Sequence, residues 1–169
     1  MAIVVVLNGT SSSGKTSIAR AFQELAPGVF LNFSIDSILY ALPPSIVERA
    51  ESGKPTGICF LDMVAAFAAC VRELAALGHD LIIDHAISTE EEVQLIRAAL
   101  ESHTTIFVGL ECPVDVLNER ERARGNRKPG MAAAQATRVH RWLEYDLTID
   151  TSRVSIEDAA RMIAGALPR

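Results

Sequence analysis

The sequence predicts a three-layer α/β fold with a mostly parallel sheet of five strands, and three observations lead to that prediction. Short apolar runs alternate with helix-like segments along all 169 residues, as they do where helices connect parallel strands. The first run, residues 3–7, is continuously apolar and rich in valine, which is typical of a strand covered on both faces. A segment rich in glycine and serine, residues 9–16, follows it and leads into a helix-like segment.

Residues 9–16, GTSSSGKT, fit the pattern G-x-x-x-x-G-K-[ST] of a phosphate-binding loop, or P-loop. The glycines let the backbone curl so that successive N–H groups point into one concavity, and the next helix adds the positive end of its dipole. Lys15 is then expected to bridge the β- and γ-phosphates of a nucleotide, and the Thr16 hydroxyl to bind Mg²⁺. The residues predicted to bind the nucleotide are Gly9, Ser11, Ser12, Ser13, Gly14, Lys15, Thr16 and Ser17. The predicted fold class is therefore a P-loop NTPase fold.

The remaining elements follow from hydrophobic periodicity, capping residues and helix breakers. Further strands are expected at residues 29–35, 81–83, 104–110 and 147–149. Helices are expected at residues 17–26, 37–42, 60–77, 88–101, 113–124, 131–143 and from residue 155 onward. Pro43 and Pro44 are expected to end the second of these helices, and the polar residues 48–57 to form a surface loop. Capping boxes are predicted at Ser88 with Glu91 and at Ser155 with Asp158.

Two carboxylates are predicted at the carboxyl ends of strands, where ligands bind in parallel sheets. Asp84 follows an apolar strand, which favours a place beside Mg²⁺, usually through water, over a role in capping a turn. Asp36 can take the proton of an acceptor hydroxyl as it attacks a γ-phosphoryl group, or it can cap the helix that starts at Ser37. The spacing alone does not separate these two roles of Asp36.

Cationic residues surround a loop bounded by glycines, and they are Arg120, Arg122, Arg124, Arg127 and Lys128. Such a stretch, residues 120–130, is typical of a helical lid that closes over phosphates, because guanidinium groups neutralise charge on a transferring phosphoryl group. Arg124 and Arg127 are the leading candidates for catalytic contacts. The alternative is a solvated helix face whose arginines pair with Glu119 and Glu121.

Three side chains are candidates for polar contacts with an acceptor in the cleft. Tyr40 follows Asp36 by one helical turn. His85 and His140 can contribute polar contacts there, with a structural role as the alternative for each.

Composition and charge narrow the class of partner. The net charge is −5, which argues against a nucleic acid held by phosphate attraction and favours a small-molecule substrate. Three cysteines without C-x-x-C spacing indicate neither a disulfide framework nor a zinc site, so reduced thiols in the cytoplasm are expected. The apolar residues 58–77 include Asp62, Arg72 and Glu73, which favours a core helix over a membrane span. A single domain, residues 1–169, without a signal peptide is expected.

Several short motifs occur together in this chain: LNG at 7–9, IDS at 35–37, IID at 82–84, ARGNR at 123–127, GMAA at 130–133 and EYD at 144–146. Together they resemble the chloramphenicol phosphotransferase family, small P-loop kinases related to nucleoside and nucleotide kinases. The resemblance implies ATP-dependent phosphorylation of a small-molecule hydroxyl, with Asp36 as the general base. It also implies that Arg120, Arg124 and Arg127 surround the phosphates.

The leading hypothesis is a cytoplasmic kinase that transfers the γ-phosphoryl group of Mg-ATP to a small-molecule hydroxyl, as an antibiotic O-phosphotransferase does. A metabolic kinase for a nucleoside, sugar or small acid is the second hypothesis, because it would share the nucleotide half of the site. A nucleotide-dependent switch is the third, although a lid and a base are superfluous for a switch. Residues 43–57 and His85 depart from the family pattern on the acceptor side, so ATP is better supported than chloramphenicol.

Overall fold

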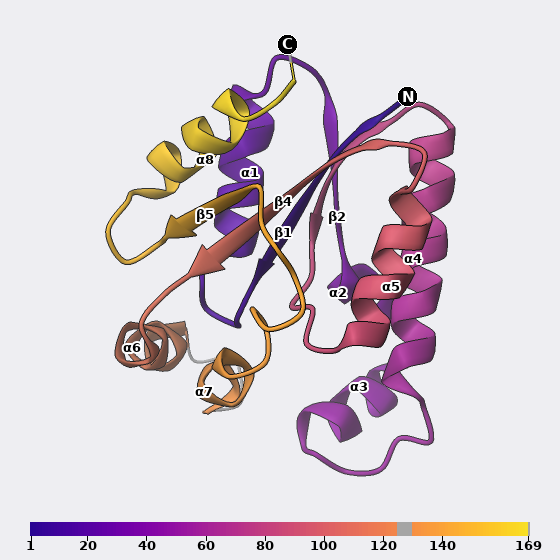
Figure 1. The fold of residues 1–169 in the computed structure, drawn as a ribbon. Coiled ribbons are helices and arrows are strands. Elements are labelled where there is room, and N and C mark those ends of the chain that lie inside the picture. The colour runs from indigo at the N-terminus through magenta and orange to yellow at the C-terminus, as the bar shows by residue number, and fades with distance from the viewer. Residues whose placement is uncertain (125–129, 169) are drawn as a thin grey trace.

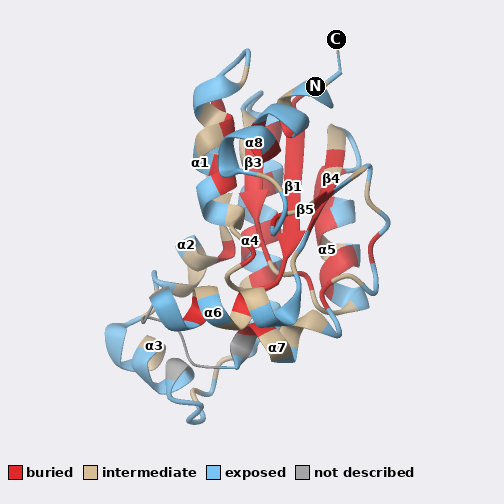
Figure 2. Ribbon diagram, turned by 90° about the vertical axis from the view of Figure 1, so that its left-hand side faces the viewer, coloured by how far each residue is buried: buried red, intermediate tan, exposed pale blue. Residues whose placement is uncertain are grey.

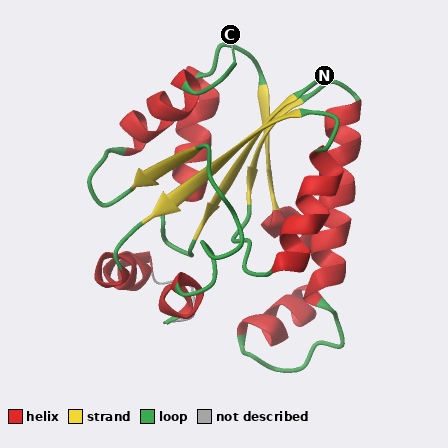
Figure 3. Cartoon of the chain, viewed as in Figure 1, coloured by secondary structure: helices red, strands yellow, loops and turns green. Residues whose placement is uncertain are grey.

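The computed structural model of the chain describes residues 1–124 and 130–168, apart from the side chains of Glu51, Arg124 and Met131. The strands of this described part are β1 (Ile3–Gly9), β2 (Phe30–Ser34), β3 (Asp80–Asp84), β4 (Thr104–Glu111) and β5 (Leu147–Asp150). They form one parallel sheet in the order β2-β3-β1-β4-β5, with helices on both faces (Figures 1 and 3). The predicted three-layer α/β fold is confirmed.

The helices are α1 (Lys15–Leu25), α2 (Ile35–Leu39), α3 (Pro44–Glu51), α4 (Phe60–Ala76), α5 (Glu90–Leu100), α6 (Val114–Arg124), α7 (Met131–Ala136) and α8 (Ile156–Gly165). Helices α1 and α8 pack on one face of the sheet and α4 and α5 on the other, while α6 and α7 lie beyond the carboxyl ends of the strands (Figure 1). Within the described residues, no helix has both the length and the apolar character needed to cross a membrane.

The central strand β1 is buried on both faces. Val4 and Val6 belong to the core beneath α4 and α5, whereas Val5 and Leu7 belong to the core beneath α1 and α8. Figure 2 shows the same burial running through the sheet, with the outer helix faces exposed. Because both faces are covered, the strand is continuously apolar, and each fully buried side chain of this kind contributes about 1.5–3 kcal/mol.

Two predicted boundaries near Asp36 are wrong. Strand β2 ends at Ser34 and α2 begins at Ile35, so Asp36 lies in the first turn of a helix and not at the end of a strand. The Ser34 hydroxyl accepts a hydrogen bond from Asp36 N–H and caps the helix. Residues 48–51 of the predicted loop 48–57 belong to helix α3. This helix can begin at Pro44, because a proline in the first turn of a helix needs no N–H partner.

One predicted helix cap is displaced and one is confirmed. The N-cap of α5 is Thr89, whose hydroxyl accepts a hydrogen bond from Glu92 N–H. The box predicted at Ser88 and Glu91 is therefore one residue too early. The box that begins at Ser155 is confirmed at the start of α8.

The chain between α7 and β5 leaves the predicted helix 131–143 after Ala136 and forms a polar cluster with β1. Asn8 Nδ2 donates to Tyr145 Oη over 2.7 Å, and Tyr145 Oη lies 2.8 Å from His140 Nδ1. Burial lowers the pKa of His140, so its neutral ring can accept a hydrogen bond from the Tyr145 hydroxyl. Burial also raises the pKa of Tyr145 to about 12, so the hydroxyl stays protonated at neutral pH.

We expect Gly109→Ala to destabilise the fold, because Tyr145 packs directly on this glycine of β4. A Cβ at position 109 would lie 2.6 Å from Cδ2 of Tyr145, well inside van der Waals contact. Overpacking of this kind costs about 1–3 kcal/mol of unfolding free energy, which urea denaturation measures. Gly165→Ala is the matched control, because a Cβ there meets no atom within 4 Å. Equal losses in the two variants would contradict this account.

Candidate active site

The loop between β1 and α1 has the backbone geometry of a P-loop. Gly14 adopts a φ of 95°, in the left-handed region that favours glycine. A Cβ on Gly9 would lie 2.7 Å from Ser13 Oγ and 2.8 Å from the Leu110 carbonyl oxygen, so only glycine fits there. The backbone therefore requires both glycines of the motif.

The loop also contains buried hydroxyl groups that have no hydrogen-bond partner among the described residues. The hydroxyl oxygens of Ser12 and Ser13 are buried and make no hydrogen bond to any described residue. An unpaired buried group costs about 1–3 kcal/mol, so two of them in one loop indicate a polar ligand. Nucleotide phosphates fit, because their oxygens accept hydrogen bonds from hydroxyls and from the N–H groups of the loop.

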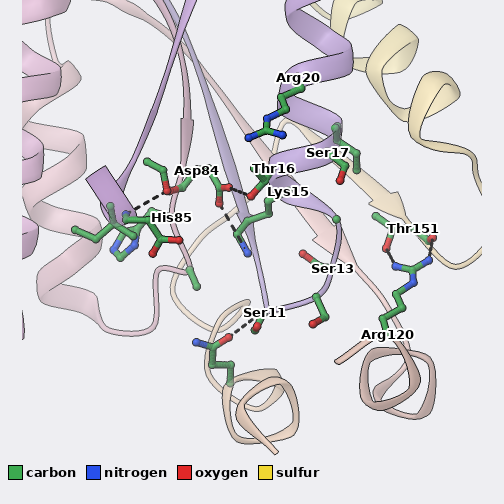
Figure 4. A pocket seen from close by; sticks show the side chains of 18 of the residues that line it. Ser11, Ser13, Lys15, Thr16, Ser17, Arg20, Asp84, His85, Arg120 and Thr151 are labelled. Carbon is green, nitrogen blue, oxygen red and sulfur yellow. Dashed lines mark hydrogen bonds and ion pairs between the residues drawn. The ribbon is translucent and has the colours of Figure 1, made fainter. Parts of the chain in front are cut away.

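Three predicted side chains converge at the start of α1 (Figure 4). Thr16 Oγ1 donates to Asp84 Oδ2 over 2.8 Å, and Lys15 Nζ lies 3.9 Å from Asp84 Oδ1. Lys15 Nζ also donates to the carbonyl oxygens of Gly9 and Thr10, at 2.9 and 2.8 Å. A hydroxyl beside a carboxylate is a set of hard oxygen donors that fits Mg²⁺. Thr16 and Asp84 are therefore close enough to bind one metal ion together.

A cavity of about 880 Å³ runs along the P-loop. One wall comes from α2 and the start of α4 and includes Ile35, Asp36 and Phe60. The opposite wall comes from the β5–α8 connection and includes Thr151 and Ile156. Asp36, although it lies on a helix, thus lines the same cavity as the P-loop. The volume is within the range of about 300–1,000 Å³ that is typical of ligand pockets.

His85 lines this cavity but is almost entirely buried, with 2% of its surface exposed. Its Nε2 lies 3.2 Å from Glu92 Oε2, out of line for a hydrogen bond. The His85 ring centroid lies 6.4 Å from that of Phe60 and 5.9 Å from that of Phe67. The Glu92 carboxylate also accepts a hydrogen bond from Ser88 N–H. His85 therefore lies at the cavity wall between a buried carboxylate and two aromatic rings.

The other two candidates for acceptor contacts lie elsewhere. Tyr40 is 56% exposed and is not among the described residues that line the cavity. His140 belongs to the cluster with Tyr145, which supports the structural alternative for this residue.

Arg120 lies across the P-loop from His85 (Figure 4). Its Nη2 donates to the Thr151 carbonyl oxygen over 2.7 Å, and its Nη1 donates to the Thr151 hydroxyl over 3.2 Å. The guanidinium group thus forms part of the wall at the β5–α8 connection and lines the main cavity. A contact of Arg120 with phosphates stays a prediction.

The predicted lid falls largely on parts of the chain outside the described residues. Arg127 and Lys128 lie there, as does the side chain of Arg124. Helices α6 and α7, which precede and follow the predicted loop, both lie at the end of the molecule where the P-loop lies (Figures 1 and 4).

Two side chains that hold α7 in place have no recognisable motif in the sequence. Glu121 is only 4% exposed, and its carboxylate accepts hydrogen bonds from Gly130 N–H and Ala132 N–H, at 2.6 and 3.1 Å. It is thus not a solvated partner for neighbouring arginines. Gln135 Oε1 accepts a hydrogen bond from Ser11 N–H over 2.6 Å. Neither position carries a signal in a single sequence, because both contacts join segments whose relative placement only the fold determines.

Known proteins resemble this chain in sequence over most of its length. Residues 2–168 match the family model described as chloramphenicol phosphotransferase-like protein. The "Putative O-phosphotransferase" of Mycobacterium tuberculosis is 30% identical over an alignment of 178 positions, which covers 94% of this chain and 79% of that protein. A shikimate kinase of Salinispora arenicola is 29% identical over 125 residues, which cover 67% of this chain and 63% of that kinase.

Solved structures share the fold. A sugar kinase from Janibacter sp. HTCC2649 has a TM-score of 0.75 at 20% identity, covering 98% of this chain and 93% of that one. The APS kinase of Mycobacterium tuberculosis has a TM-score of 0.70 at 18% identity, covering 97% and 96%. The tunicamycin resistance protein of Deinococcus radiodurans has a TM-score of 0.69 at 21% identity, covering 98% and 95%. At these identities the likeness concerns the fold alone.

Proposed function

This chain belongs to the chloramphenicol phosphotransferase-like family, and from that premise we propose that it is a small-molecule kinase that uses ATP and Mg²⁺. It transfers the γ-phosphoryl group of ATP to a hydroxyl of the acceptor. The observation that carries the proposal is a single cavity lined by the P-loop, the Thr16–Asp84 pair and Asp36. A phosphate-binding loop, oxygen ligands for a metal ion and a carboxylate for proton transfer are the parts that this reaction requires.

The P-loop side of the cavity binds and orients the nucleotide. The N–H groups of the loop and the hydroxyls of Ser12 and Ser13 donate to phosphate oxygens. Lys15, whose ammonium lies at the rim of the loop, adds a positive charge at the β- and γ-phosphates. We assign Arg124 and Arg127, from the sequence alone, to the same neutralising role.

On the acceptor side, Asp36 is assigned as the general base. Its carboxylate takes the proton of the acceptor hydroxyl while the hydroxyl oxygen bonds to the γ-phosphorus. The bond from that phosphorus to the β,γ-bridging oxygen breaks in the same step, and ADP leaves with the electron pair. The cap from Ser34 fixes the first turn of α2, so the carboxylate starts from an ordered backbone.

The acceptor wall supports a substrate with an apolar body. Ile35, Leu39 and Phe60 line this part of the cavity, and Phe60 is 48% exposed. Apolar and aromatic side chains bind apolar rings better than they bind sugars or small acids, because burial of apolar surface drives the contact. Chloramphenicol, which combines an aromatic ring with hydroxyls, is therefore the acceptor we propose first.

The free cysteines fit a reducing compartment such as the cytoplasm.

Incubation with Mg-ATP and a panel of hydroxyl compounds tests this proposal. The panel contains chloramphenicol, a nucleoside, gluconate and shikimate, and the readouts are ADP release and the mass of the product. We expect phosphorylated chloramphenicol as the main product. Phosphorylation of only the polar acceptors would contradict chloramphenicol as the acceptor and would favour a metabolic kinase. Phosphorylation of none of a wide panel would overturn the proposal.

Asp84→Asn is expected to weaken the use of Mg²⁺, with activity about 10- to 100-fold lower at limiting metal concentration. The reason is that asparagine keeps the shape of Asp84 but loses the charge that attracts the metal ion and its waters. Raising the Mg²⁺ concentration should restore part of the activity, which a titration of initial rate against Mg²⁺ measures. Asp115→Asn, at an exposed position of α6, is the control. An unchanged metal titration for Asp84→Asn would contradict the assignment.

A further inference from the structure

The carboxamide of Gln135 is bound to the P-loop itself. Its Oε1 accepts a hydrogen bond from Ser11 N–H over 2.6 Å, and the dashed line at Ser11 in Figure 4 marks this contact. Because an N–H group donates, the oxygen of the carboxamide must face the loop. The NH₂ group, on the same carbon, is therefore a donor next to the loop, and Gln135 lines the nucleotide cavity.

A second observation shows which part of the nucleotide would lie there. Lys15 Nζ donates to the carbonyl oxygens of Gly9 and Thr10, so Lys15 and Gln135 bind the same peptide unit, Thr10–Ser11, from its two opposite sides. In a P-loop the lysine marks the β- and γ-phosphate end of the nucleotide. Gln135 is thus bound to the same part of the loop as the lysine, which favours the γ-phosphate as the group that its NH₂ donor reaches.

The helix that carries Gln135 is held from both ends. The buried Glu121 carboxylate accepts hydrogen bonds from Gly130 N–H and Ala132 N–H at the start of α7. Asn8 Nδ2 donates to the Val139 carbonyl oxygen over 2.7 Å beyond its end. Side chains that are positioned by such supporting bonds lose little freedom when they bind a ligand.

We propose that Gln135 binds the γ-phosphate and thereby lets the site distinguish ATP from ADP. Its oxygen stays on Ser11 N–H, and its NH₂ group donates to a γ-phosphate oxygen while Lys15 engages the same phosphate. ADP offers no oxygen at that place, so it gains nothing from Gln135. The contact disappears when the γ-phosphoryl group is transferred, which favours release of ADP over retention. This inference rests on the proposed function in one respect, because it takes ATP as the phosphoryl donor.

Calorimetric titration of the full chain with Mg²⁺ and either ADP or the non-hydrolysable β,γ-imido analogue of ATP tests the proposal without an acceptor. A hydrogen bond to a charged group corresponds to roughly a tenfold change in Kd. We therefore expect Gln135→Ala to bind the analogue about tenfold more weakly while its Kd for ADP changes by less than about twofold. Gln135→Glu should lose more affinity for the analogue, because its carboxylate can still accept from Ser11 N–H but repels the phosphate.

Gln94→Ala, at an exposed position of α5, is the matched control and should bind both nucleotides as the unmodified chain does. Equal losses of affinity for ADP and for the analogue in Gln135→Ala would show that Gln135 only shapes the loop, and would overturn the proposal. Unchanged binding in both Gln135 variants would overturn it as well. Failure of the unmodified chain to bind either nucleotide would instead overturn the proposed function.

Discussion

Replacement of Asp36 by asparagine is expected to lower kcat by about 10²- to 10⁴-fold, the contribution of a positioned general base, with little change in affinity for ATP. Asparagine has the shape of aspartate but cannot take the proton from the acceptor hydroxyl. The hydrogen bond from the backbone N–H of residue 36 to Ser34 Oγ does not involve the replaced side chain, so α2 should begin as before. Steady-state rates with a phosphorylatable acceptor measure the effect.

Two further measurements make the Asp36→Asn result interpretable. Thermal unfolding of the variant should match that of the unmodified chain, which excludes loss of fold as the cause. Asp115→Asn repeats the chemical change at an exposed position and should leave kcat unchanged. Near-normal turnover in Asp36→Asn would mean that transfer proceeds without this base, as a loose transition state with little need for early proton removal would allow.

Lys15→Ala is expected to lower kcat by about 10²- to 10³-fold, the size of the loss when one preorganised donor to developing charge is removed. The ammonium group of Lys15 lies at the rim of the P-loop, 3.9 Å from Asp84 Oδ1, where it can follow the γ-phosphoryl group during transfer. The KM for ATP should rise too, because we also assign Lys15 a contact with the phosphates in the ground state. Initial rates at varied ATP concentration separate the two effects.

The control for Lys15→Ala must separate lost charge from a distorted loop, because Lys15 Nζ also binds the carbonyl oxygens of Gly9 and Thr10. Lys54→Ala removes the same group from an exposed position and should leave kcat and KM unchanged. Circular dichroism and thermal unfolding of Lys15→Ala should show a folded chain. A variant that is folded and fully active would contradict the assignment of residues 9–16 as a P-loop.

The P-loop could be predicted from the sequence because its determinants are local. Residues 9–16 lie between one strand and one helix, and the requirement for glycine at Gly9 and Gly14 is a property of the backbone there. The same holds for β1, whose burial on both faces is visible as an unbroken apolar run. The place of Asp36 was predicted less well, because a single hydroxyl, that of Ser34, decides where β2 ends and α2 begins.

Contacts between distant segments could not be predicted in this way. Asn8 is a polar residue at the end of an apolar strand, which indicates that its side chain makes a specific hydrogen bond. Its partner Val139, however, lies 131 positions away in the sequence. Gln135 and Ser11 are 124 positions apart. Each pair meets only because the sheet brings β1 next to β4 and because the chain returns from α7 to β5. A single sequence contains the hydrogen-bonding groups but not their pairing.

The strand order has a consequence for how this protein can change its substrate. Strand β1 is the middle strand, so the P-loop lies between a half of the sheet that carries Asp36 and His85 and a half that carries the Thr151 connection. In the proposed function, the acceptor is recognised by the half that carries Asp36, and the transferred group lies at its boundary with the other half. Under that proposal, substitutions in α2 and α4 change the acceptor without altering the P-loop, residues 9–16. The proposed kinase would then take a new acceptor with the same phosphate site.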